Sequence, residues 1–212
     1  MTLFLDGRRQ VVDACLTLAD RGYLAGIGGN VAKRLDEVHF AVTPSAADYY
    51  TMHPEDICVL RLDTLQVIDG VLKPSVESGM HAAMLRFHRD AGASVHTHQP
   101  LASAVALIDR GIPLQSGDPM GDEVSLVGYG PSGTGLLVRA LSRRLRPARL
   151  AYLLRNHGVI CAAPSLDTAI ASVARIEAAA ARLLEDLIGR RPVPHPALAE
   201  LIGAALQPGR QP

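Results

Sequence analysis

AYLLRNHGVICA, residues 151–162, contains two apolar runs on either side of a short polar segment. The runs at 151–154 and 159–162 are short and almost wholly apolar, which is typical of buried strands. Between them, Arg155-Asn156-His157-Gly158 indicates a tight turn. Strands joined by so short a turn pair antiparallel. The stretch therefore predicts a hairpin that carries His157 at an edge of the sheet, where a cleft can form.

Strand and helix patterns alternate irregularly on the N-terminal side of this hairpin. Periodicity predicts strands at 38–42, 57–62, 66–71 and 94–98, and helices at 8–20, 76–89, 101–109, 134–146 and 167–190. Residues 112–127 are rich in Gly and Asp and are expected to be mostly loop. Hairpin-like pairs of short strands favour a mixed or antiparallel sheet covered by helices over a repeating βαβ pattern.

Length and composition fit one α/β domain with a full core. The chain has 212 residues, and its 21 basic and 21 acidic side chains cancel. Zero net charge gives no long-range attraction to nucleic acid or to an anionic membrane. We therefore assign residues 1–190 to one domain, and residues 191–212, which contain several prolines, to a peripheral tail.

No feature of the sequence indicates export or a membrane span. The N-terminus lacks a long apolar region, and no uninterrupted apolar stretch approaches the roughly 18 residues that a spanning helix needs. Cys15, Cys58 and Cys161 are far apart and form no CxxC pair, which is typical of free thiols in a reducing compartment. These features predict a cytoplasmic protein.

Three histidines form a candidate metal site. His96 and His98 lie on a predicted strand, and because side chains alternate along a strand, both imidazoles project from one face and can meet one ion. Taken alone, such a pair is more often two polar residues at a strand end. His157 supplies a third imidazole, and three neutral imidazoles are a common catalytic zinc set that leaves a position open for water or substrate.

One carboxylate accompanies this set. Glu77 opens the helix expected at 76–89, where a negative charge complements the helix dipole. The same carboxylate can serve as a fourth ligand or as a general base beside the ion. His81 lies four residues later on the same helical face, so it is either a partner that orients Glu77 or a packed helix histidine.

A further group of residues can bind an anion. Gly28-Gly29-Asn30 can direct backbone N–H groups at an oxyanion or a phosphate. Thr43, Ser45 and Ser75 are hydroxyls at the starts of loops and can donate to the same anion. Each of these residues, taken alone, is more often part of an ordinary turn.

Taken together, these segments resemble the class II aldolase/adducin family, whose enzymes include L-fuculose-phosphate aldolase. The resemblance extends from about Val11 to Leu184. Five motifs carry it in the family's order: Gly29-Asn30-Val31, Thr43-Pro44-Ser45, Lys73-Pro74-Ser75-Val76-Glu77, His96-Thr97-His98 and Asn156-His157-Gly158. Five short motifs in the right order make the resemblance specific.

The resemblance implies a single three-layer α/β/α domain around a mostly antiparallel sheet, and a homotetramer with sites near subunit interfaces. It implies a zinc ion on His96, His98 and His157, with Glu77 able to join the ion or to leave it and move a proton. Mn²⁺ or Co²⁺ would suit the same ligands. The phosphate of a small-molecule substrate would lie against Gly29, Asn30, Ser45 and Ser75.

The reaction that the resemblance implies is retro-aldol cleavage of a small sugar phosphate through a zinc-stabilised enediolate, which is a lyase activity. Two positions depart from the family pattern. Val76 replaces a second Ser that could donate to phosphate, and no Tyr follows Ile112-Pro113. Both departures leave room for a metal-dependent decarboxylase or a sugar-phosphate epimerase. A non-catalytic, adducin-like module is a third alternative.

Overall fold

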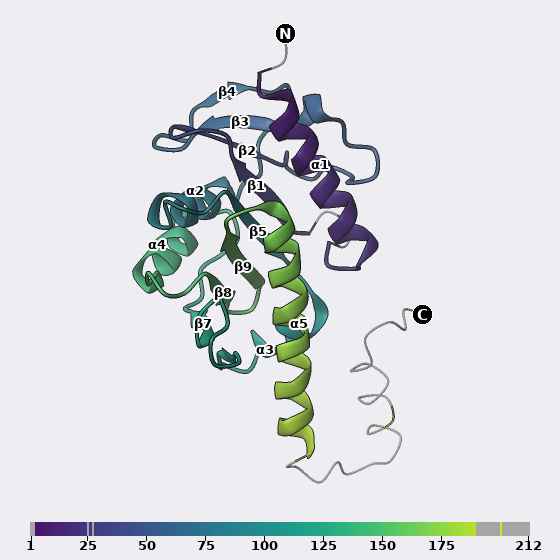
Figure 1. The fold of residues 1–212 in the computed structure, drawn as a ribbon, viewed down its shortest axis with the longest axis vertical. Helices are drawn as coiled ribbons and strands as arrows, with labels where there is room; N and C mark the ends of the chain where they lie inside the picture. The colour runs from purple at the N-terminus through teal and green to yellow at the C-terminus, as the bar shows by residue number, and fades with distance from the viewer. Residues whose placement is uncertain (1–2, 25, 27, 190–199, 201–212) are drawn as a thin grey trace.

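Nine strands form one sheet in the computed structural model, which describes residues 3–189 apart from 25 and 27, together with residue 200. The order of strands across the sheet is β4-β3-β2-β1-β5-β9-β8-β7-β6 (Figure 1). The strands are β1 (Asn30–Arg34), β2 (His39–Val42), β3 (Cys58–Arg61), β4 (Val67–Asp69), β5 (Ala93–Thr97), β6 (Ile112–Pro113), β7 (Glu123–Val127), β8 (Ala151–Leu154) and β9 (Gly158–Ala163).

Every neighbouring pair in this sheet is antiparallel except β7 and β8. The hairpin predicted from residues 151–162 is confirmed, because β8 and β9 pair antiparallel with Leu154 opposite Gly158. Since parallel neighbours need a crossover, the chain passes from β7 to β8 through a helix, α4. The result is the mixed, mostly antiparallel sheet that the sequence predicts.

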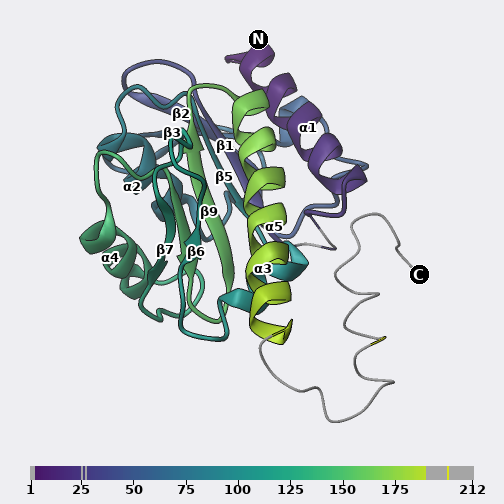
Figure 2. The ribbon, with the colours of Figure 1, turned by 60° about the horizontal axis from the view of Figure 1, so that its bottom comes forward.

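The five helices of the described chain cover both faces of the sheet, as the turned view shows (Figure 2). One layer contains α1, α3 and α5, and the opposite layer contains α2 and α4. They are α1 (Leu5–Asp20), α2 (Ser78–Phe87), α3 (Pro100–Val105), α4 (Gly135–Arg144) and α5 (Leu166–Gly189). This arrangement confirms the predicted three-layer α/β/α fold.

Two apolar cores fill the spaces between these layers, and residue alternation along the strands divides the side chains between them. Val31 and Val95 belong to the core under α1 and α5, whereas Ala32 belongs to the core under α2 and α4. Because successive side chains point to opposite faces, Asn30, Ser94 and His96 lie on the α2 side. The polar residues of β1 and β5 therefore face α2.

The sequence-based prediction left out three strands. Residues 112–127 are mostly loop, as expected, but they also contain β6 and β7, and Val124 and Val127 of β7 are fully buried. Burial of these β-branched side chains outweighs the neighbouring Gly and Asp residues. The sequence analysis also missed β1, which directly follows the Gly-rich segment.

The C-terminal tail assigned to 191–212 lies outside the described residues, except for residue 200. In the part of the chain that the structure describes, none of the helices has both the length and the apolar character that crossing a membrane requires.

Candidate active site

The three candidate ligand histidines converge at one end of β5. His96 lies in β5, His98 is the first residue after β5, and His157 lies in the turn between β8 and β9. One ligand nitrogen from each ring lies within 4.8 Å of the others, and the Nε2 atoms of His96 and His98 are 3.0 Å apart. The structure thus brings together the trio that the sequence singled out.

Gly158 allows this convergence because there is no room for a side chain at its position. A Cβ atom there would lie 2.4 Å from the carbonyl oxygen of Thr97, 2.8 Å from the His98 ring and 3.3 Å from the His96 ring. Contacts below 3.0 Å cannot form unless the backbone or the ring moves. The Asn-His-Gly motif therefore lets β9 approach β5 closely enough for His157 to join the other two rings.

We expect Gly158→Ala to lower the free energy of unfolding by about 1–3 kcal/mol, the usual cost of overpacking a filled interior. The melting temperature of the metal-free protein should fall, and the affinity for a divalent ion should fall with it because the rings are pushed apart. Gly128→Ala is the matched control, since a Cβ at Gly128 meets nothing within 4 Å. Equal melting temperatures for the two variants would contradict this account.

The protonation states of the rings suit metal binding. Burial lowers the pKa of His96 well below its usual range although the Glu77 charge opposes the shift. Burial also lowers the pKa values of His98 and His157. His96 Nδ1 lies 2.7 Å from the carbonyl oxygen of Val159, which can only accept, so Nδ1 carries the proton and Nε2 has a free lone pair. Neutral imidazole is the form that binds a cation.

The spacing of the rings fits a divalent cation, and one of the ring nitrogens lacks a hydrogen-bond partner among the described residues. Ring nitrogens about 2.0–2.1 Å from a tetrahedral zinc ion lie roughly 3.3 Å from one another, close to the observed His96–His98 separation. His157 Nδ1 is buried and has no hydrogen-bond partner among the described residues. His96 is fully buried whereas His98 is exposed, so one side of the cluster is open to solvent.

Glu77 lies against this cluster with both carboxylate oxygens. Its Oε2 is 3.2 Å from His96 Nε2, and its Oε1 is 3.3 Å from His157 Nε2. The carboxylate is 5% exposed and accepts hydrogen bonds from Asn30 Nδ2 at 2.8 Å and from Ser132 Oγ at 2.7 Å. Because His96 Nε2 carries no proton, its lone pair and the carboxylate oxygen of Glu77 repel each other. A cation bound to both atoms would remove this repulsion.

The charge state of Glu77 follows from these contacts. Burial raises its pKa, but the positive charge of the His96 ring in its protonated form and the hydrogen bonds from Asn30 and Ser132 lower it more. The net pKa lies below the usual range for a glutamate, so the side chain is a carboxylate at neutral pH. A buried carboxylate beside three imidazoles can bind a cation or accept a proton.

Ser132 was missed by the sequence analysis. It lies in the loop between β7 and α4, and nothing in its short Pro-Ser-Gly context distinguishes it from an ordinary turn. The loop packs on Val76: a Cβ added at Gly133 would lie 3.0 Å from Val76 Cγ2. Val76, which departs from the family pattern, therefore supports the loop that brings Ser132 to Glu77.

The residues expected to bind an anion mostly line one small cavity of about 180 Å³ beside Glu77. Gly29, Asn30, Ser45 and Ser75 are among the lining residues, together with Val76, Ser132, His98 and His157. Thr43 is not, and its buried hydroxyl accepts a hydrogen bond from the Val31 amide. Among the described residues no Lys or Arg lines this cavity, so an anion would meet backbone N–H groups and hydroxyls.

Asn30 contacts Glu77 rather than leaving its side chain free for an anion. Its Nδ2 donates to Glu77, and its Oδ1 lies 2.6 Å from His81 Nε2. The sequence leaves His81 as either a partner that orients Glu77 or a packed helix histidine, and the structure connects its Nε2 to Glu77 through Asn30. Tyr49 also borders the cavity, where its hydroxyl donates to the Gly29 carbonyl oxygen at 2.7 Å.

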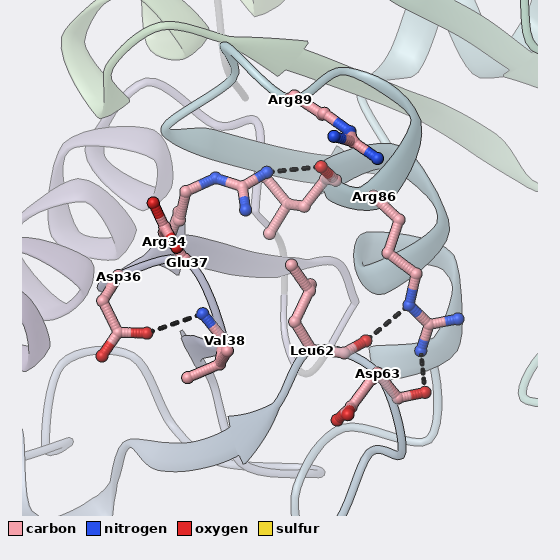
Figure 3. Close-up of a pocket in the computed structure, with 9 residues that line it drawn as sticks. Arg34, Asp36, Glu37, Val38, Leu62, Asp63, Arg86 and Arg89 are labelled. Atoms are coloured by element: carbon pink, nitrogen blue, oxygen red, sulfur yellow. Dashed lines mark hydrogen bonds between the residues drawn. The ribbon is translucent and has the colours of Figure 1, made fainter.

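A larger cavity of about 860 Å³ lies away from this site and has a different character (Figure 3). Arg34 and Arg86 line it, and their guanidinium groups donate to backbone carbonyl oxygens, including those of Leu85 and Leu62. These arginines connect α2 to the neighbouring strands and loops. Size alone would favour this cavity, but the convergent imidazoles and the buried carboxylate are in the smaller one.

Comparison with known proteins gives consistent matches. The model of the "Class II Aldolase and Adducin N-terminal domain" family matches residues 9–184. The chain is 34% identical to 5-deoxy-D-ribulose 1-phosphate aldolase of Bacillus thuringiensis serovar kurstaki, over 80% of each chain. It is 28% identical to methylthioribulose-1-phosphate dehydratase of Pectobacterium atrosepticum, over 71% of this chain and 80% of that protein.

A solved structure of L-fuculose 1-phosphate aldolase superposes with a TM-score of 0.77 at 25% sequence identity. The match covers 94% of this chain and 95% of the other. Aldolases and a dehydratase are thus similar to the same polypeptide, and each named substrate is a phosphorylated ketose.

Proposed function

Because the chain belongs to the class II aldolase and adducin family, we propose that it is a metal-dependent aldolase that cleaves a small ketose phosphate. Lyase activity follows from the family and from relatives named as aldolases. The single observation that carries the proposal is the convergence of three imidazole nitrogens on the buried carboxylate of Glu77.

We assign the metal to His96, His98 and His157, with Glu77 as a neighbour that can bind it or release it. The ion is Zn²⁺, Mn²⁺ or Co²⁺, since three imidazoles and a carboxylate suit each of these. When bound, it supplies a Lewis acid for the carbonyl and hydroxyl oxygens of the ketose.

The carboxylate of Glu77 is suited to move a proton. Retro-aldol cleavage breaks a carbon–carbon bond, releases a hydroxyl proton as the aldehyde forms, and leaves an electron pair on the ketone fragment. That fragment must take up a proton at carbon. A base or acid for this step has to lie within about 3 Å of the reacting group. Glu77 borders both the histidine cluster and the cavity, as such a role requires.

The cavity would bind the phosphate end of the substrate. The backbone of Gly29 and the hydroxyls of Ser45 and Ser75 line the cavity, and Asn30 borders them while it contacts Glu77. The amides of Ser45 and Ser75 already donate to backbone carbonyl oxygens. Neutral donors fix the remote end of a substrate, so that binding energy orients the reacting carbons. Thr43 would support the loop rather than touch the anion. The homotetramer and the cytoplasmic location remain predictions from the family resemblance and from the sequence.

Dehydration is a second candidate reaction, favoured by the similarity to a methylthioribulose-1-phosphate dehydratase. It was not among the reactions that the sequence suggested. Loss of water beside a ketone also requires a base next to the carbonyl, so Glu77 could serve both reactions. Decarboxylation and epimerisation remain alternatives that would use the same residues. A non-catalytic module is not supported, because the family relatives are enzymes and all the candidate site residues are present.

The test is a set of ketose 1-phosphates incubated with the enzyme, each paired with the same ketose lacking phosphate. We expect release of an aldehyde and a phosphorylated three-carbon ketone, with kcat/KM at least about 100-fold higher for the phosphorylated substrates, as remote binding energy would provide. Mass spectrometry separates aldol cleavage from dehydration, since dehydration keeps all carbons in one product that is lighter by one water. Decarboxylation is tested separately, by CO₂ release from β-keto acids or their phosphates. Failure to form aldehyde from any of the ketose 1-phosphates would contradict the proposal.

A further inference from the structure

A row of buried polar side chains leads from the sheet to Glu77. Ser94 Oγ lies 2.8 Å from His81 Nδ1, His81 Nε2 lies 2.6 Å from Asn30 Oδ1, and Asn30 Nδ2 lies 2.8 Å from Glu77 Oε2. Ser94 and His81 are fully buried, and Asn30 and Glu77 are 6% and 5% exposed. These residues come from three elements, β1, α2 and β5, and from the residue before α2.

The direction of each hydrogen bond in this row follows from the Glu77 carboxylate, at its end. A carboxylate can only accept, so the group of Asn30 that faces Glu77 must be its NH₂. The amide oxygen of Asn30 then faces His81 and needs a donor, which places the proton of His81 on Nε2. His81 Nδ1 is consequently an acceptor and receives the hydroxyl proton of Ser94.

Without His81, only the Glu77 carboxylate would set the orientation of the Asn30 amide. An Asn side chain can exchange its oxygen and nitrogen by rotating about one bond, and the two orientations have nearly the same shape. The wrong orientation would direct a carbonyl oxygen at the Glu77 carboxylate, where two electron-rich atoms repel. The buried N–H group of His81, on the other side of the amide, disfavours that orientation further, because two donors would then face each other.

We infer that His81 is a positioning residue that holds the Asn30 amide with its NH₂ group toward Glu77 and thereby directs the carboxylate at the histidine cluster. Ser94 completes this arrangement by donating its hydroxyl proton to His81 Nδ1, the acceptor nitrogen of the tautomer that donates from Nε2. The inference rests on the proposed role of Glu77 and extends the site to residues that touch neither substrate nor ion.

Burial lowers the pKa of His81 to about 4, although the Glu77 charge opposes the shift. The ring is therefore neutral near pH 7, in keeping with a donor at one nitrogen and an acceptor at the other. Because it is 0% exposed and does not border the cavity, its effect on the reaction must pass through Asn30.

The test compares His81→Leu with His81→Gln in the metal-loaded enzyme. Leu removes the donor at similar volume, and we expect kcat to fall about 10- to 100-fold, the usual cost of losing such a supporting hydrogen bond. The KM should change less than about threefold, since the anion-binding groups are untouched. Gln can donate to Asn30 through its amide and should recover part of the lost kcat.

The matched control is His88→Leu. His88 lies seven residues later, next to the end of α2, and is also buried, at 8% exposure. It lies outside the row, so its replacement should leave kcat within about threefold while lowering the melting temperature to a similar extent. Equal kcat values for His81→Leu and His88→Leu would overturn the inference.

Two further measurements separate positioning from general stability. In a double-mutant cycle, His81→Leu should have little further effect on kcat once Asn30 is replaced by Ala, because His81 then has no amide to orient. Full additivity would overturn the inference. In the zinc-loaded wild-type protein, ¹⁵N NMR should show His81 with its proton on Nε2, and a proton on Nδ1 would equally overturn it.

The outcomes also distinguish this inference from the proposed function. If Glu77→Gln abolishes activity and His81→Leu does not lower kcat, the positioning role is wrong and the proposed function stands. If Glu77→Gln keeps full activity, the proposed role of Glu77 is wrong, and the inference about His81 falls with it.

Discussion

Replacement of Glu77 by Gln should lower kcat by about 100- to 10,000-fold, the range that general acid–base catalysis contributes. Gln has nearly the same shape but cannot take up and return a proton near neutral pH. Its amide would also present an NH₂ group to Asn30 or to Ser132, both of which donate to the native carboxylate. The measurement is the steady-state rate of aldehyde release, with the metal content of each preparation determined in parallel.

The loss should not come from unfolding. Glu77 is an ionised group at 5% exposure, and its replacement by a neutral isostere removes a desolvated charge. We therefore expect the melting temperature of the metal-free variant to stay within a few degrees of the wild type. Glu37→Gln is the control, because that carboxylate is exposed and lines the distant larger cavity. A Glu77→Gln enzyme with at least one third of the wild-type kcat would exclude Glu77 as the proton carrier.

The histidine cluster was predictable because its residues lie in segments whose structure is simple to deduce. Alternation along a strand places His96 and His98 on one face without any knowledge of the fold. A histidine in the turn of an apolar hairpin must lie at the ends of the two strands that the turn joins. The family resemblance then joined His157 to the other two, and the geometry agrees.

The surroundings of Glu77 were less predictable, since they depend on how separate elements pack. Asn30 faces His81 and Glu77 because β1 pairs with β5 in a register that sets Asn30 opposite His96. The strand β1 was not predicted, and Asn30 was expected at an anion site from its Gly-Gly-Asn context and from the family resemblance. Ser132 donates to Glu77 from a loop that packs on Val76, and the loop at 128–134 carries no periodic pattern that would reveal such packing.

The strand β7 was missed within residues 112–127 for a related physical reason. Gly and Asp are frequent in loops, but a strand needs only a few well-placed apolar residues if both its faces are covered. Val124 and Val127 supply these in β7, which is parallel to β8. A parallel neighbour is reached through a helix, so no hairpin turn marks the strand in the sequence.

Replacement of His98 by Ala should remove the bound divalent ion and lower kcat at least about 100-fold, since even the partners of metal ligands usually contribute 10- to 100-fold. His98 is the most informative ligand to change because it is exposed, so its loss leaves no buried cavity. We expect metal analysis to give about one ion per wild-type chain and almost none in the variant. His53→Ala, at another exposed histidine, should keep both ion and activity.

Chelation should reproduce this loss without any mutation, and Zn²⁺, Mn²⁺ or Co²⁺ should restore activity to different extents. A His98→Ala protein that binds an ion as tightly as the wild type would disprove the assignment. So would a chelated wild type that keeps its full rate.

The fold, rather than the ion, holds the rings in place, and this decides what chelation does to stability. His96 is fixed by its hydrogen bond to Val159, and His157 by the close approach of Gly158 to β5. The metal-free protein should therefore keep its native circular dichroism spectrum. Adding the ion at about 1,000 times its Kd should then stabilise the fold by about 4 kcal/mol, because the ion binds only the folded cluster. In His98→Ala this increase in melting temperature should vanish, which ties the ion to the histidines independently of any catalytic assay.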